Sequence, residues 1–174
     1  MTDPSPLPEA TDPGERKCLA SVERVGWHIV HVPPEGDTPG WSFTVGLPRT
    51  QGHPELVAFG IPHEIAHDVL DAVCAQIKAG ARFADGARVK DVLDECELLV
   101  RPVQPRWYEP FLGYAIWFHR GENFEALQLF WPAGDDDIWP WDPSATDEIR
   151  GDQPLLYEED AERANAQALL DSME

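Results

Sequence analysis

The chain has 174 residues and carries 32 Asp and Glu against 13 Lys and Arg, which gives a formal net charge of −19. This length is that of one domain, which can bury a substantial core without disulfide or metal staples. The negative charge repels phosphate backbones and disfavours nucleic-acid binding. No uninterrupted apolar run approaches the roughly 20 residues that cross a bilayer, so we expect no membrane-spanning segment.

The cysteines and the first residues of the chain indicate a compartment. Cys18, Cys74 and Cys96 form an odd set without CxxC spacing. The first 16 residues contain no apolar stretch of the kind found in signal peptides. We therefore expect a cytoplasmic protein with reduced thiols.

The N-terminal half of the chain predicts a disordered segment, three strands and a helix. Residues 1–16 are rich in Pro and acids, a composition typical of disorder. Alternating apolar residues over 26–32 have the period of a strand. The aromatic and β-branched runs at 41–47 and 56–61 predict two more strands. A helix follows between Pro62 and Gly80, because Pro suits the first helical turn and Gly suits the position after the last.

The C-terminal half contains fewer regular patterns. Its predicted elements are a strand over 97–103 that ends or lies at an edge near Pro102, a broken aromatic helix over 107–119, a strand over 126–131, an acidic loop over 133–153, and an acidic helix or tail over 158–174. Strands and helices do not alternate regularly, so a parallel α/β sheet is disfavoured. We predict a single α+β domain over 17–157 with a mainly antiparallel sheet and two or three helices; a split-barrel-like fold is the alternative.

Two short runs carry a resemblance to a known family. The first is WSFTVGL, from Trp41 to Leu47, and the second is HPEL, from His53 to Leu56. They resemble the hallmark of the domain of unknown function 4262 family, small bacterial proteins in which an aromatic-x-(Tyr/Phe)-Thr-(Val/Ile)-Gly-Leu run precedes a His/Ser-Pro-Glu-Leu run. Further matching residues are Gly26, Trp27, Val30, Arg101, Pro102, Val103, Trp107, Tyr108, Gln128, Trp131 and Pro132. The resemblance covers roughly residues 18–157 and implies no activity, because none is assigned to that family.

The start of the predicted helix contains an HExxH motif, from His63 to His67. Two histidines one helical turn apart can share a zinc ion, and the intervening Glu can act as a base towards metal-bound water. The pattern is that of a metal-dependent hydrolase with His63 and His67 as zinc ligands, which we keep as an alternative; otherwise we expect no cofactor. The sequence identifies no third ligand. The alternative is a polar flank of an ordinary helix.

Aromatic and charged residues elsewhere suggest a cleft for a small ligand. Arg offers a bidentate fork for carboxylates and stacks on aromatic rings. A His and a Glu separated by one residue, where a loop meets a strand, can support acid–base chemistry if both face a cleft. The candidate ligand-binding residues are Trp41, His53, Glu55, Arg101, Trp107 and Tyr108. Alternatively, the Arg neutralises the protein's own carboxylates, the aromatic residues build core, and His53 and Glu55 belong to a turn.

The negative charge is concentrated near the C-terminus. Residues 135–174 hold 13 acids and 2 bases. Within this region Trp139 and Trp141 are aromatic residues among charges, which can anchor a partner protein; they can equally cover the sheet. The first functional hypothesis is therefore a non-catalytic interaction module, an immunity- or antitoxin-like binder of a basic protein. The second is the small-ligand-binding protein or metal-dependent hydrolase described above.

Overall fold

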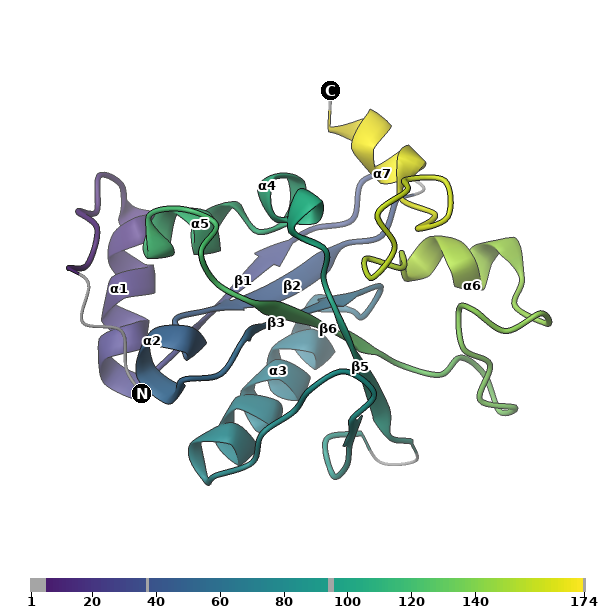
Figure 1. The fold of residues 1–174 in the computed structure, drawn as a ribbon, viewed down its shortest axis with the longest axis horizontal. Helices are drawn as coiled ribbons and strands as arrows, with labels where there is room; N and C mark the ends of the chain where they lie inside the picture. Colours follow the sequence, from purple (N-terminus) through teal and green to yellow (C-terminus); the bar gives the residue numbers. More distant parts are fainter. Residues whose placement is uncertain (1–5, 37, 94–95, 174) are drawn as a thin grey trace.

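The computed structural model describes residues 6–36, 38–93 and 96–173, and its centre is a six-stranded sheet in the order β1-β2-β3-β6-β5-β4 (Figure 1). The strands are β1 (His28–Val32), β2 (Trp41–Val45), β3 (Glu55–Phe59), β4 (Arg88–Val89), β5 (Leu98–Pro102) and β6 (Ala126–Phe130). The helices are α1 (Pro13–Val25), α2 (Leu47–Gln51), α3 (His63–Lys78), the 3-10 turn η1 (Pro105–Trp107), α4 (Tyr108–Phe111), α5 (Gly113–His119), α6 (Asp147–Asp152) and α7 (Gln167–Ser172).

The sheet is mainly antiparallel. β1, β2 and β3 form an antiparallel meander, and β6, β5 and β4 form another. The two meanders join through a parallel pairing of β3 with β6, in register from Glu55 opposite Ala126. This confirms the predicted α+β class. Because β1 and β4 stand at opposite ends of the strand order, the sheet is open and the split-barrel alternative is wrong.

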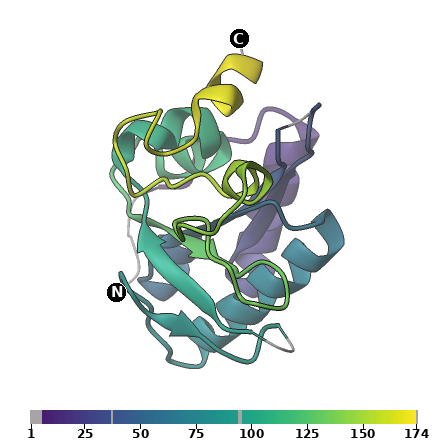
Figure 2. The same cartoon turned by 90° about the vertical axis from the view of Figure 1, so that its right-hand side faces the viewer.

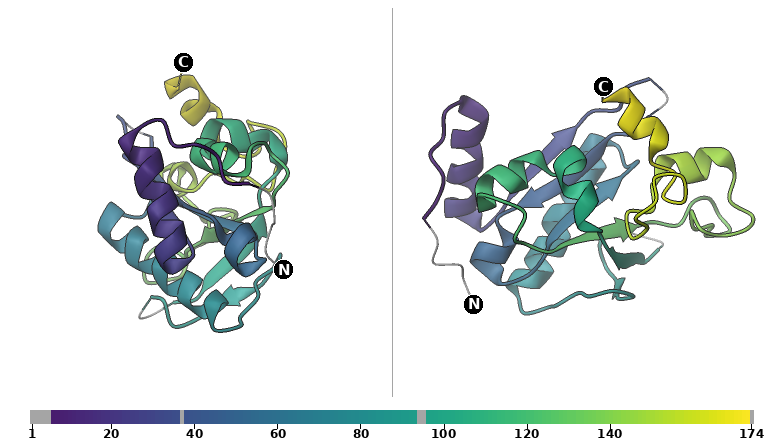
Figure 3. Two further views of the ribbon diagram at one scale, coloured as in Figure 1. Left: turned by 90° about the vertical axis from the view of Figure 1, so that its left-hand side faces the viewer. Right: turned by 45° about the horizontal axis from the view of Figure 1, so that its top comes forward.

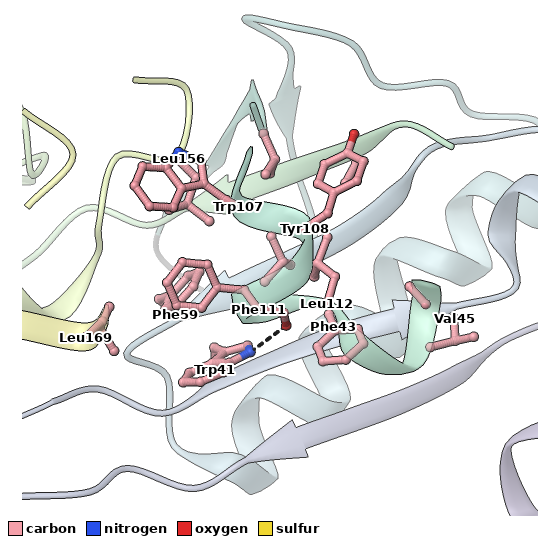
Figure 4. Close-up of a cluster of buried hydrophobic side chains, with 14 of the residues drawn as sticks. Trp41, Phe43, Val45, Phe59, Trp107, Tyr108, Phe111, Leu112, Leu156 and Leu169 are labelled. Carbon is pink, nitrogen blue, oxygen red and sulfur yellow. Dashed lines mark hydrogen bonds between the residues drawn. The ribbon is translucent and has the colours of Figure 1, made fainter. Parts of the chain in front are cut away.

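The sheet separates two apolar cores. One core contains residues of α1, α4, α5 and α7, and its centre is a group of aromatic rings in which the Trp41 indole N–H donates to the Phe111 carbonyl at 2.9 Å (Figure 4). The other core lies under α3 and contains Leu70, Val73 and Ile77. Side views show α4 and α5 on one face and α3 on the other (Figures 2 and 3).

Several elements differ from the predicted ones. Helix α1 begins at Pro13, inside the segment expected to be disordered, because Asp12 caps it by accepting from the Glu15 N–H. Residues 1–5 of that segment lie outside the described residues. Helix α6 lies within the predicted loop over 133–153, and helix α7 is shorter than the predicted C-terminal helix. The two-residue strand β4 was not predicted.

Candidate functional site

A buried carboxylate occupies the junction between β2, α2 and β3. Glu55 is fully buried. Its Oε1 accepts from the Thr44 hydroxyl at 2.8 Å and from the Leu47 N–H at 3.2 Å. Its Oε2 accepts from the Gly46 N–H at 2.7 Å and from His119 Nε2 at 2.8 Å. We call Glu55, Thr44, Gly46, Leu47 and His119 the Glu55 network.

The Glu55 network leaves no acceptor site for an outside group. An ionised carboxylate offers about four lone-pair positions, and four donors occupy them. The Thr44 hydroxyl also accepts from the Leu56 N–H at 2.8 Å, which links two neighbouring strands. Gly46 has a φ of 111°, and a Cβ there would lie 2.9 Å from the Val22 side chain, so only glycine fits. The arrangement therefore holds the chain together and has no free base.

His53 is likewise committed to the fold. It is 2% exposed. Its Nε2 accepts from the Phe83 N–H at 3.1 Å, so Nδ1 carries the proton and donates to the Pro54 carbonyl at 2.8 Å. Burial lowers the pKa of the His53 imidazole. His53 and Glu55 therefore point into separate networks and do not form the predicted acid–base pair.

Three other predicted ligand-binding residues contact distant parts of their own chain. The Arg101 guanidinium bonds Asp85 at 2.8 Å and lies 4.0 Å over the Tyr157 ring. The Trp107 indole N–H donates to the Glu158 carbonyl at 2.7 Å, and the side chain is 1% exposed. The Tyr108 ring is buried and stacks on Phe124 at a centroid distance of 4.8 Å. None of these three residues lines the two hollows described below.

Trp139 and Trp141 are only partly exposed. Their rings stack on each other with centroids 5.2 Å apart, and the Arg88 guanidinium lies over Trp139. Trp141 packs edge-on against Phe130 of β6. The indoles thus fold back onto the sheet.

Histidines from two elements meet beside the edge strand β1. His31 of β1 and His67 of α3 face each other, with 3.3 Å between His31 Nε2 and His67 Nδ1. The His63 ring, one turn earlier on α3, stacks on His31 with centroids 3.8 Å apart. His31 Nδ1 lies 2.6 Å from the hydroxyl of Ser42, its partner in the β1–β2 register.

Two adjoining hollows lie on either side of this cluster. A hollow of about 350 Å³ runs between α1 and α3, and a hollow of about 500 Å³ lies at the N-terminus of α3. His31 and His63 line both. We call the two hollows together the histidine groove. Besides His31 and His63, the smaller hollow is lined by residues that include His28, His67 and Asp71. The larger hollow is lined by residues that include Trp41, Ser42 and Asp152.

Burial and neighbouring histidines keep His31 uncharged. Desolvation is the main cause that lowers the pKa of the His31 imidazole to about 4, and His63, His67 and His28 add to it. Burial also lowers the pKa of His28. At neutral pH the groove therefore presents His31 as a neutral imidazole.

Comparison with known protein families identifies the family of this chain. The model of the family described as domain of unknown function (DUF4262) matches residues 21–146. The chain belongs to this family. No curated protein and no solved structure matches the chain.

The DUF4262 match confirms the resemblance, and the structure shows what several of the hallmark residues do. The hallmark residues Thr44, Gly46, Leu47 and Glu55 all belong to the Glu55 network. In this member of the family, the two runs therefore meet in a structural junction. None of the described helices combines the length and the apolar character that crossing a membrane requires.

Sequence reasoning found two of the three clustered histidines of this DUF4262 member and missed the third. His63 and His67 are visible as an i, i+4 pair, whereas His31 is 36 residues from His67 in the chain. Its only signal was the alternation of β1, which placed it on the same face as Trp27 and Ile29, the face that packs beneath α3. Pairing of β1 with β2 and packing of α3 bring the three rings together.

Proposed function

We propose that this protein binds a small organic ligand in the histidine groove. The observation that supports the proposal is the pair of hollows that share His31 and His63. Each hollow falls within the range of roughly 300–1,000 Å³ that is usual for small-molecule sites. The support for the second hypothesis from the sequence thus lies at the HExxH residues His63 and His67, whereas Trp41 is the one member of the predicted ligand-binding set that lines the groove.

The walls of the larger hollow indicate the chemistry of the ligand. Its apolar surface comes from Val32, Trp41, Ile61 and several prolines. Its polar groups include those of His31, Ser42, His63 and Asp152. A mainly apolar wall with a few polar groups is typical of a site that orients a ligand with an apolar body and a hydrogen-bonding head group.

The proposal concerns binding and contains no hydrolytic step. Glu64, the candidate base of the HExxH motif, is exposed and lines neither hollow of the groove. A base must reach the water or substrate from which it takes a proton. The basic protein partner remains a prediction from the charge of residues 135–174, with Trp139 and Trp141 as its proposed contacts.

Native mass spectrometry of the protein, gently purified from its own cells, tests the proposal. We expect the native mass to exceed the denatured mass by a stoichiometric small-molecule increment. His63→Trp places a larger exposed side chain across both hollows and should remove the increment. Glu64→Trp changes the neighbouring exposed residue in the same way and should retain it.

Two results would count against the proposal. One is a bare chain in every preparation. The other is an increment that survives His63→Trp, because the ligand would then lie outside the groove. A second polypeptide in place of a small molecule would instead support the interaction hypothesis.

A further inference from the structure

We infer that the histidine groove holds a divalent transition-metal ion, with the imidazoles of His31, His63 and His67 as its protein ligands. This inference rests on the proposed function, since the ion would form part of the surface that the organic ligand meets. The site adds His31 of β1 to His63 and His67, the two histidines of the HExxH motif on α3.

The spacing of two nitrogens is the first argument. His31 Nε2 and His67 Nδ1 are 3.3 Å apart. Zn–N bonds of about 2.0–2.1 Å at a tetrahedral angle place two ligand nitrogens roughly 3.3–3.4 Å from each other. Hydrogen bonds from an N–H group are most often near 2.9–3.0 Å. The observed separation therefore matches that of two ligands of one ion.

Ser42 supplies the second argument because it fixes the orientation of His31. The serine is 3% exposed, and its hydroxyl lies 2.6 Å from His31 Nδ1. Histidines that bind metals usually engage their other nitrogen with a second group, which sets the ring and its tautomer. With Nδ1 engaged by Ser42, Nε2 is the nitrogen available on the side of His67.

His63 needs a rotation to join the other two ligands. In the present orientation its ring stacks on His31, and no three His, Cys, Asp or Glu side chains of the described residues surround a common point at metal-binding distance. His63 is exposed, and exposed side chains change rotamer within nanoseconds. Its position one helical turn before His67 places it on the same side of α3.

The donor chemistry selects the class of ion. Imidazole nitrogens suit Zn²⁺, Ni²⁺, Co²⁺ and Cu²⁺, whereas Mg²⁺ and Ca²⁺ prefer oxygen. The net charge of −19 attracts cations in general. Three protein ligands leave a fourth tetrahedral position open, which a water or a head group of the bound ligand can take.

Titration of the purified protein with Zn²⁺ alone, followed by calorimetry, tests the inference. We expect one ion per chain and a visible ligand-field spectrum when Co²⁺ replaces Zn²⁺. His63→Gln and His67→Gln should each weaken Zn²⁺ binding at least about 10- to 100-fold, the loss known for even the outer partners of metal ligands. Glu64→Gln is the matched control and should leave the affinity unchanged within about twofold.

The outcomes separate this inference from the proposed function. Both replaced histidines, His63 and His67, are exposed, so we expect these variants to fold. Unchanged Zn²⁺ affinity in His67→Gln, or an absence of stoichiometric binding, would overturn the metal site. The native mass experiment uses no added metal, so an organic increment seen there would leave the proposed function intact.

Discussion

The Glu55 network and the histidine groove both contain polar residues that attract attention in the sequence, yet they use them in opposite ways. Four donors saturate the buried Glu55 carboxylate. In the groove, His63 and His67 are exposed and border hollows. A polar side chain whose partners all come from its own chain stabilises the fold, whereas one that borders empty space is available to a ligand.

Replacing the buried carboxylate should have the largest effect on stability. Glu55→Gln replaces one accepting carboxylate oxygen by an amide NH₂ group, which cannot accept hydrogen bonds from the donors that surround it. We expect the free energy of unfolding to fall by about 3 kcal/mol, because each buried donor left without its acceptor costs about 1–3 kcal/mol. Urea denaturation measures this loss. Glu109→Gln, at an exposed glutamate, should leave stability unchanged within about 0.5 kcal/mol. A loss below about 1 kcal/mol for Glu55→Gln would show that the network contributes little.

The pH dependence of stability tests the commitment of His53 to the fold. Burial lowers the pKa of folded His53 below the value of about 6.5 in unfolded chains. The unfolded state then binds more protons as the pH falls, so stability is fully present above about pH 6.5 and decreases below it. His53→Gln should flatten the decrease in unfolding free energy between pH 7.5 and 5.5, measured by urea denaturation; an unchanged slope would contradict the assignment.

Substitutions of histidines in the histidine groove should have the smallest effect on stability. His63→Gln and His67→Gln remove exposed side chains, so each should change the free energy of unfolding by no more than about 0.5 kcal/mol. Thermal unfolding without added ligand or metal measures the change. A loss comparable to that of Glu55→Gln would mean that the two regions do not differ in the way described.

Local patterns predicted most of the central sheet. The aromatic and β-branched runs that become β2 and β3 are recognisable without tertiary information, and Pro102 does mark a strand end. Strand β4 has only two residues, so it has no period to detect. Helix α1 was obscured by a Pro- and acid-rich beginning, although Asp12 followed by Pro13 is a cap followed by a first-turn proline.

The sites were less predictable than the strands. Glu55 and His119 are 64 residues apart, so the saturation of the carboxylate could not be read from the HPEL run. Arg101 and Tyr108 looked like ligand contacts because their partners, Tyr157 and Phe124, lie elsewhere in the chain. Whether a polar side chain is satisfied depends on packing between distant segments, which residue spacing does not encode.

The place of β6 in the sheet bears on how the chain folds as it is synthesised. β6 is the last strand in the sequence, yet it lies between β3 and β5. β1, β2 and β3 can pair as soon as they leave the ribosome, whereas β4 and β5 have no neighbour in that meander. They join it only when residues 126–130 have emerged, about 70 residues after the start of β3. Contacts between such distant residues form slowly, so the insertion of one central strand controls when the two halves become one domain.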